Sequence, residues 1–257
     1  MKKKSVLIFI IAYKASHRLL DVFKKIPLSE NKNFNLAVLI SDDNSNDDTF
    51  DYAIKIKSKK KKVIINSNKV NLGYGAHIKK CLLFALKKKF DYAIMIHGDG
   101  QYNPIYIKNI LREFKKNSNL GAVTGSRILK GINKVTEGGM PFYKLIGNIL
   151  LTKIHNLFLN TSFSDAHSGL WGYNLKYLKS KKFMRLTNSF NFDQHMRFYY
   201  IANKLTISEI PINTKYGDER SQLHIVYAMK FFFQIFNFII NKNKFKKSII
   251  EKNIYIL

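Results

Sequence analysis

The sequence predicts an α/β fold with a mainly parallel sheet flanked by helices, and three observations support this prediction. Short apolar runs rich in β-branched residues alternate with helical patterns as far as Ser126. Polar residues and glycines gather where the apolar runs end. The chain has 257 residues, of which 46% are hydrophobic, so it can bury one large core.

Five apolar runs have the length and composition of buried strands. They cover residues 5–12, 34–41, 63–66, 92–96 and 121–124. Helical patterns separate them at residues 18–25, 47–57, 74–88 and 104–116. The last helix has a clear start, because Asn103 suits its N-cap and Pro104 suits its first turn.

Beyond Ser126 the alternation stops. A loop with Gly131, Gly138 and Gly139 leads to a helix at residues 142–159, and a less regular region extends to Ile210. We interpret this half as a substrate-binding elaboration of the first. No linker rich in Pro, Gly or Ser is found, so we expect one catalytic domain over residues 1–223, followed by a helix and a basic tail over residues 224–257.

The N-terminal lysines and the apolar residues 6–12 imitate a secretory signal, but the run is short and Lys14, His17 and Arg18 follow it. We therefore interpret it as the first buried strand. No uninterrupted apolar stretch reaches the roughly 18 residues of a membrane span. Cys81 is the single cysteine, which excludes an internal disulfide and favours a core thiol.

The charge is strongly basic: 44 Lys and Arg against 17 Asp and Glu give +27. Such a surface suits a nucleic acid or an acidic membrane, although a lysine-rich proteome would explain it equally well. Only six of these residues are arginine, the side chain favoured for forked recognition of phosphates and bases. A nucleic-acid-binding protein is therefore the disfavoured alternative.

The stretch at residues 97–104 indicates a site. Asp99 lies between Gly98 and Gly100 directly after an apolar strand, where open α/β sheets place ligands. We expect the two glycines to let the backbone approach a bulky group closely, and Asp99 to offer a hard oxygen to Mg²⁺ or Mn²⁺. The alternative is a polar turn with an exposed Asp.

The other strand ends repeat this pattern, at Ala12-Tyr13, at residues 42–49, at residues 71–76 and at Gly125-Ser126-Arg127. Each has a structural alternative in helix capping; Ser45 or Asn46, for example, would cap the second helix. Five successive strand ends of this kind favour a shared site.

With these motifs in order, the chain resembles family 2 glycosyltransferases of the GT-A (Rossmann-like) fold. Within them it is similar to the polyprenyl-phosphate branch, which resembles dolichyl-phosphate mannose synthase. Ala12-Tyr13 resembles the opening signature, and Asp42-Asp43 the acidic motif in which, by analogy, Asp43 contacts the base. The segment around Gly73 matches a further signature.

His97-Gly98-Asp99-Gly100-Gln101 occupies the place of the family's metal-binding D-x-D-x-Q, with His97 replacing the first aspartate. The resemblance therefore assigns the metal to Asp99, with Gln101 as a possible second ligand. It also assigns donor binding to Ala12, Tyr13, Asp42, Asp43, Gly73, His97 and Arg127. Arg127 would donate to a phosphate, with a surface ion pair as its alternative, and His97 would touch the metal shell or the sugar, with simple packing as its alternative.

Later motifs concern the acceptor. Asp165 falls in a D-x-x-S-G-like segment, and Asp193 in a segment whose acidic residue is the base in some members; both are candidates for orientation or base catalysis. Asp193 has a helix cap as its alternative. Lys144 and Arg220 are candidates to hold an acceptor phosphate, and residues 209–221 resemble the end of the catalytic domain.

The resemblance implies an inverting transfer of sugar from a UDP-, GDP- or dTDP-linked donor, with the cation stabilising the departing diphosphate. An ionised lipid phosphate would need no base, whereas a saccharide hydroxyl would. The apolar helix at residues 224–240, with polar positions at 230, 234 and 237, suits a membrane interface at the cytoplasmic face. Packing against the domain or in a homo-oligomer is its alternative.

Overall fold

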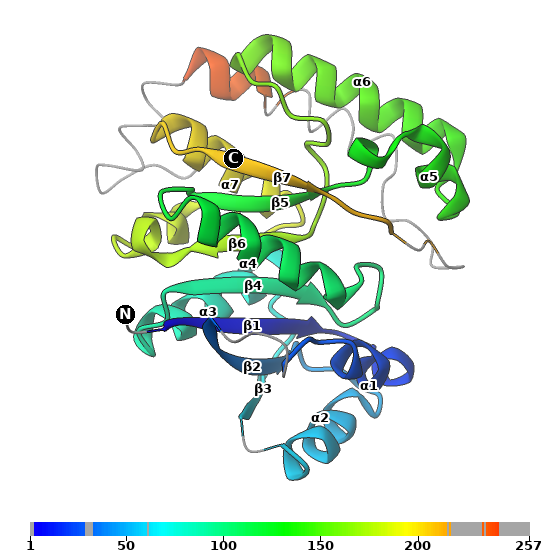
Figure 1. Ribbon diagram of the computed structural model, residues 1–257, viewed down its shortest axis with the longest axis vertical. Helices are drawn as coiled ribbons and strands as arrows, with labels where there is room; N and C mark the ends of the chain where they lie inside the picture. Colours follow the sequence, from blue (N-terminus) through cyan, green and yellow to red (C-terminus); the bar gives the residue numbers. More distant parts are fainter. Residues whose placement is uncertain are drawn as a thin grey trace.

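The computed structural model describes residues 3–28, 33–60, 62–214, 216, 233 and 235–241. A seven-stranded sheet in the order β3-β2-β1-β4-β6-β5-β7 forms its centre, with helices on both sides (Figure 1). The strands are β1 (Lys4–Ala12), β2 (Phe34–Asp42), β3 (Val63–Ser67), β4 (Tyr92–His97), β5 (Ala122–Ser126), β6 (Trp171–Asn174) and β7 (Ile207–Pro211). Only β6 runs antiparallel to its neighbours among these strands, so the expected mainly parallel sheet is confirmed.

The helices follow the expected alternation in the first half. They are α1 (Ser16–Lys24), α2 (Thr49–Ser58), α3 (Tyr74–Lys87), α4 (Ile107–Lys116), α5 (Ile132–Glu137), α6 (Phe142–Leu159) and α7 (Phe192–Ala202). The side chain of Asn103 accepts a hydrogen bond from the Ile105 amide, and Pro104 opens a 3-10 turn that leads into α4. The predicted start of this helix is confirmed.

Both faces of the sheet are buried, which explains why its strands are almost continuously apolar. On one face, Ile8 and Ile10 of β1 belong to a core with α1, α2 and α4. On the other face, Leu7 and Phe9 belong to a core with α3 and α7. Cys81 is buried in this second core, as expected for a structural thiol.

Strands β6 and β7 were not expected, because the sequence predicted an irregular region there. All four residues of β6 are buried, so its side chains show no apolar and polar alternation. Gly172 in β6 lies against α4, because a Cβ at this position would clash with Ile110 Cγ2. Tertiary packing therefore builds this strand where local sequence signals are weak.

Only part of the expected C-terminal helix falls among the described residues, where Phe233 and residues 235–240 are helical. Ile235 and Phe238 are buried, and the ring of Phe238 stacks on Phe198 of α7 at 4.4 Å. Phe233, Phe236 and Ile240 are exposed. The described helices include none that is long and apolar enough to cross a membrane. Residues 242–257 lie outside the described chain, and the division at residue 223 stays a prediction.

Candidate active site

The end of β1 joins the two acidic loops of the candidate site. The Asp43 amide donates to the Ala12 carbonyl at 2.9 Å, and the Gly98 amide donates to the Ile11 carbonyl at 2.9 Å. The acidic loop after β2 and the Asp99 loop after β4 therefore flank the same strand end. A Cβ on Gly98 would lie 3.1 Å from the Ile11 carbonyl oxygen, so this glycine lets β4 approach β1 rather than a ligand. Gly100 has a positive φ of 76°, which accounts for the second glycine.

Asp42 and Asp43 are buried and hold the neighbouring loops in place. Asp42 accepts hydrogen bonds from Ser45 and from the Ser67 hydroxyl, the latter at 3.0 Å. Ser45 also accepts from the Lys14 amide, so the expected capping of α2 by Ser45 is wrong. At the actual start of α2, the Thr49 amide donates to Asp47.

Asp43 organises the loop between β3 and α3. Its Oδ1 accepts from Asn68 Nδ2 at 2.7 Å and from the Leu72 amide at 2.9 Å, and its Oδ2 accepts from the Gly73 amide at 3.0 Å. Gly73 has a φ of 78°, and a Cβ there would meet nothing within 4 Å. Both acids are therefore occupied by protein donors, and they position the loops that line the edge of the sheet. Their contact with a donor nucleotide stays a prediction.

At the tip of β1, Ala12 is buried but the Tyr13 side chain is 51% exposed. Its ring lies at the same edge of the sheet as the Asp99 loop, and the Lys14 ammonium is 5.5 Å from it. Of the two residues assigned to the donor here, only Tyr13 therefore presents a side chain to solvent.

Asp99 is half-buried, and its carboxylate can still bind a cation. Its Oδ1 accepts from the Gln101 amide at 2.9 Å, and its main-chain carbonyl accepts from Arg18 Nη1 at 3.2 Å. Within the described ranges, no group of three or more His, Cys, Asp or Glu side chains could hold a metal. The Asp99 carboxylate nevertheless fits a hard cation that takes its remaining ligands from water and substrate phosphates. Gln101 is half-buried two residues away.

A hydrogen-bonded chain at the end of β4 links four segments. The Tyr74 hydroxyl donates to Asp193 Oδ2 at 2.7 Å and lies 3.5 Å from His97 Nε2. His97 Nε2 is 3.2 Å from the carbonyl oxygen of Gly169. Burial lowers the pKa of His97, against the opposing charge of Asp99, so the imidazole is neutral at pH 7.

Asp193 lies in the first turn of α7 without capping it. No side chain caps this helix at Asn191, and Oδ1 of Asp193 is a buried atom without a partner in the described part of the chain. Burial raises the pKa of Asp193 to about 7, although the Tyr74 hydrogen bond and the Arg197 charge act in the opposite direction. The capping alternative is therefore wrong, and a carboxyl group that titrates near neutrality suits proton transfer.

The loop before α7 is clamped onto α3. Lys79 is buried, and its ammonium donates to the carbonyls of Met184 and Leu186 and, at 2.8 Å, to Asn188 Oδ1. The Ala76 amide donates to the Asn188 carbonyl at 3.2 Å. This clamp brings Phe190 against Tyr74, with their ring centroids 5.0 Å apart.

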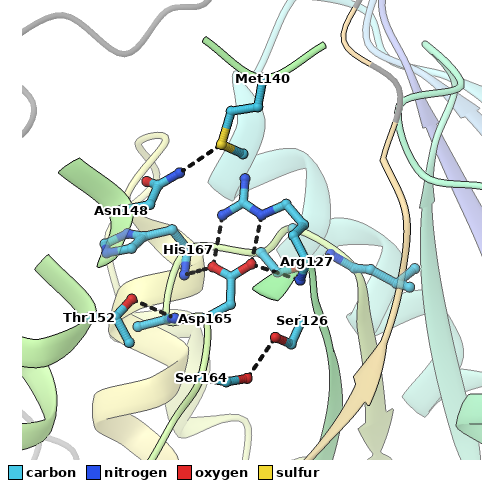
Figure 2. Close-up of polar contacts among 12 residues, drawn as sticks. Ser126, Arg127, Met140, Asn148, Thr152, Ser164, Asp165 and His167 are labelled. Carbon is cyan, nitrogen blue, oxygen red and sulfur yellow. Dashed lines mark hydrogen bonds and ion pairs between the residues drawn. The ribbon is translucent and has the colours of Figure 1, made fainter. Parts of the chain in front are cut away.

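Arg127 and Asp165 form a buried ion pair (Figure 2). Asp165 also accepts hydrogen bonds from the Arg127 and His167 amides. Burial alone would raise the pKa of Asp165, but the charge and the hydrogen bonds of Arg127 outweigh it and hold the pKa below its ordinary value. Two sequence expectations change: the surface ion pair proposed for Arg127 is buried, and its forked donor face is engaged by Asp165 rather than open to phosphate.

Asp165 is fixed from further sides. The Asp165 amide donates to Glu209 Oε1 at 3.0 Å, and Arg197 Nη2 donates to the Asp165 carbonyl at 3.2 Å. Such a saturated carboxylate is a positioning group and a poor base. Arg197 and Tyr74 were missed as site residues, because a lone Arg or Tyr in a helical pattern carries no local signal of burial.

The predicted acceptor residues are less defined. Lys144 is half-buried in the first turn of α6, with its ammonium 5.8 Å from the Tyr143 ring. Arg127 Nη1 donates to the Tyr216 hydroxyl at 2.8 Å, and the Tyr216 amide donates to Gly138. These bonds tie the loop after α5 to the Asp165 pair. Arg220 lies outside the described residues.

The sheet topology is that of a GT-A fold, and the comparisons agree. The model of glycosyl transferase family 2 matches residues 7–180, so the chain belongs to this family and is a glycosyltransferase. It is similar to UDP-N-acetylglucosamine--dolichyl-phosphate N-acetylglucosaminyltransferase of Methanococcus voltae, at 26% identity over 230 residues covering 85% of this chain and 88% of the relative. An uncharacterized protein of Methanocaldococcus jannaschii is 26% identical over 220 residues, covering 85% and 84%.

Solved structures show the same fold. Glucosyl-3-phosphoglycerate synthase from Mycobacterium tuberculosis in complex with UDP has a TM-score of 0.63 at 14% identity, covering 93% of this chain and 80% of that chain. The same enzyme with Mn²⁺, UDP and glucosyl-3-phosphoglycerate has a TM-score of 0.60 at 12% identity, covering 93% and 79%. The resemblance to family 2 and its GT-A fold, predicted from the sequence, is confirmed.

Proposed function

We propose that this glycosyltransferase moves a sugar from a UDP-, GDP- or dTDP-linked donor to a polyprenyl phosphate or a cell-surface glycan, with inversion and with a divalent cation. The observation that carries the proposal is the junction at the end of β1, where the Asp43 and Asp99 loops bond to neighbouring carbonyls. The loop that would receive the nucleoside and the carboxylate that would serve the diphosphate thus lie side by side. The Methanococcus voltae relative is named as a dolichyl-phosphate N-acetylglucosaminyltransferase, and this name supports a lipid-phosphate acceptor.

In this proposal Asp99, and Gln101 beside it, hold Mg²⁺ or Mn²⁺. The bound cation supplies Lewis-acid stabilisation of the negative charge that develops on the diphosphate. Asp43 keeps the Gly73 loop in place for the nucleoside, and Tyr13 offers an exposed ring at the same edge. Arg127 keeps Asp165 and the segment after it in position, which leaves Lys144 and Arg220 as cations for an acceptor phosphate.

A lipid phosphate is already ionised and attacks the anomeric carbon without a base. A saccharide hydroxyl is the second candidate acceptor, and the position of Asp193 favours it specifically. This carboxyl group is bonded to Tyr74 beside His97, and its pKa of about 7 lets it accept a proton near neutral pH. Base catalysis by Asp193 belongs to this second candidate alone.

We place the enzyme at the cytoplasmic face of the membrane as a peripheral protein. Large apolar side chains are exposed along α6, and Phe142, Ile146 and Leu150 share one face because they recur every four residues. No acidic residue occurs between Gly138 and Ser164, whereas Lys144 and Lys153 do. An apolar helix face with basic and no acidic neighbours suits an anionic lipid surface. The exposed Phe233, Phe236 and Ile240 support the same assignment for the C-terminal helix.

Thermal unfolding with UDP, GDP or dTDP, each with Mn²⁺, tests the donor assignment. One nucleoside diphosphate should raise the melting temperature, because a hundredfold excess over its dissociation constant stabilises the folded protein by about 2.7 kcal/mol. RNA should not do so. If none of the three nucleotides raises the melting temperature and the protein binds RNA in a salt-sensitive way, the proposal is contradicted and the nucleic-acid alternative is favoured.

Flotation with liposomes that contain anionic lipid tests the membrane assignment. Ile146→Glu with Leu150→Glu should abolish co-flotation, since both side chains are exposed and their replacement leaves the core intact. Met184→Glu, at an exposed apolar residue outside α6, is the matched control and should still float. Unchanged flotation of the α6 variant contradicts the assignment.

A further inference from the structure

His97 replaces the first aspartate of the family's metal motif. The contacts of its ring indicate which of the two ring nitrogens is available to a ligand. A carbonyl oxygen only accepts hydrogen bonds, so His97 Nε2, 3.2 Å from the Gly169 carbonyl, carries the ring proton. The Tyr74 hydroxyl directs its own proton to Asp193. An imidazole that donates through Nε2 has Nδ1 as its acceptor nitrogen.

Nδ1 remains available to a ligand. Both hydrogen-bond contacts of the His97 ring among the described residues use Nε2, so Nδ1 has no partner there. It belongs to a half-buried side chain two residues before Asp99. A ring held through Nε2 leaves Nδ1 as the nitrogen that can bind a ligand.

The contact that holds the ring is built by several residues. The Gly169 amide donates to the Tyr102 hydroxyl at 2.8 Å, which fixes the peptide that receives Nε2. A Cβ on Gly169 would lie 3.2 Å from His97 Nε2 and 3.3 Å from the Tyr102 hydroxyl, so a larger residue would crowd the ring. The Tyr102 ring packs edge-on against His97, with centroids 5.1 Å apart. Metal-bound histidines almost always donate their second ring N–H to a carbonyl or carboxylate in this way.

We propose that His97 Nδ1 is a ligand of the divalent cation, beside Asp99, and that it shifts the cation preference from Mg²⁺ to transition metals such as Mn²⁺ and Co²⁺. Imidazole nitrogen is a good ligand for first-row transition metals, whereas Mg²⁺ takes oxygen. The described chain offers no third His, Cys, Asp or Glu ligand, so the diphosphate completes the shell and binding needs the nucleotide. This inference rests on the proposed nucleotide-sugar chemistry.

The test is pulsed electron paramagnetic resonance of Mn²⁺ bound to the full chain with UDP, GDP or dTDP, whichever nucleotide stabilises it. Protein with ¹⁵N-histidine should show a ¹⁵N coupling where unlabelled protein shows a ¹⁴N coupling, while nucleotide nitrogens stay unlabelled. His97→Gln keeps an amide near the Nε2 position for Gly169 but removes Nδ1. It should abolish the histidine coupling and weaken Mn²⁺ about tenfold or more while leaving Mg²⁺ little changed.

Two further variants complete the design. His97→Asp restores the carboxylate and should reverse the preference toward Mg²⁺. His17→Gln, at an exposed histidine of α1, is the control and should keep the coupling. Nucleotide-dependent Mn²⁺ binding without a histidine coupling, unchanged in His97→Gln, overturns the inference and leaves the donor assignment intact. Absence of any nucleotide-dependent cation binding overturns both.

Discussion

Arg127 and Asp165 form a bidentate ion pair inside the protein, in which Arg127 Nε donates to Asp165 Oδ2 at 2.6 Å and Nη2 donates to Oδ1 at 2.8 Å. The Asp165 side chain is fully buried and that of Arg127 is 7% exposed. The pair joins the end of β5 to the segment before β6, and Arg197 and Glu209 hold the same segment by its main chain. This arrangement fixes the end of β5 to the segment before β6.

Asp165→Asn should lower the free energy of unfolding by about 3–5 kcal/mol, because it leaves the Arg127 charge buried and unpaired. Urea denaturation measures this change. Glu137→Gln is the matched control, since it breaks the exposed Lys134–Glu137 pair and should change stability by about 1 kcal/mol or less. Equal effects of the two substitutions would contradict the structural role of the Asp165 pair.

Gly75→Ala should destabilise the protein by about 1–3 kcal/mol through overpacking. A Cβ at Gly75 would be 2.7 Å from the Ser189 carbonyl oxygen and 2.8 Å from the Asn188 carbonyl, so the clamp between α3 and the loop before α7 would have to open. Gly147→Ala, in α6 where nothing lies within 4 Å of the new Cβ, should be neutral or stabilise by up to about 1 kcal/mol. Chemical denaturation of both variants provides the measurement, and a harmless Gly75→Ala would refute the clamp.

Asp99→Ala should reduce cation-dependent transfer by about a hundredfold or more, since a cation supplies several kcal/mol of charge stabilisation. Initial rates with Mn²⁺ measure the loss. Asp21→Ala, at an exposed acid of α1, should keep the wild-type rate. If Asp99→Ala also kept it, the cation would have to bind elsewhere.

Asp193 should make stability depend on pH. Its folded pKa of about 7 is raised above the value of about 3.9 in unfolded chains, so between these values the folded state binds the extra proton. Stability should therefore fall as pH rises through this window, and the loss should be complete above pH 7. Asp193→Asn stays neutral, so its stability relative to wild type should increase from pH 4 to pH 8. Urea denaturation at several pH values in this range measures the free energy of unfolding of both proteins. If the two curves of stability against pH run parallel, the pKa of Asp193 is not raised.

Asp193→Asn should also separate the two acceptors. Transfer to a saccharide hydroxyl should fall by about a hundredfold or more, because a base is lost. Transfer to polyprenyl phosphate should change only a few-fold. Product formation with each acceptor measures this difference, and a large loss with the phosphate acceptor would contradict direct attack by an ionised phosphate.

The first five strands and their helices could be predicted because each has a strong local signal. Asn103 and Pro104, for example, mark the start of the 3-10 turn that leads into α4. Strand β6 could not, because a four-residue strand buried on both faces lacks periodicity. The carboxylates Asp42, Asp43, Asp99 and Asp193 could be selected as site candidates by their type and order, and their roles stay predictions. Their partners were not: the Tyr74–Asp193 bond joins residues 119 positions apart, and only the folded chain brings them together.

The proposed transfer can be measured by incubating the full chain with Mn²⁺, polyprenyl phosphate and a panel of UDP-, GDP- and dTDP-sugars, and by determining the masses of the lipid products by mass spectrometry. We expect one donor class whose sugar mass is added to the lipid phosphate, and we expect this addition to be lost in Asp99→Ala. Sugar transfer that proceeds equally well in Asp99→Ala would contradict the cation assignment, and the absence of a lipid-linked product from every donor would contradict the lipid-phosphate acceptor.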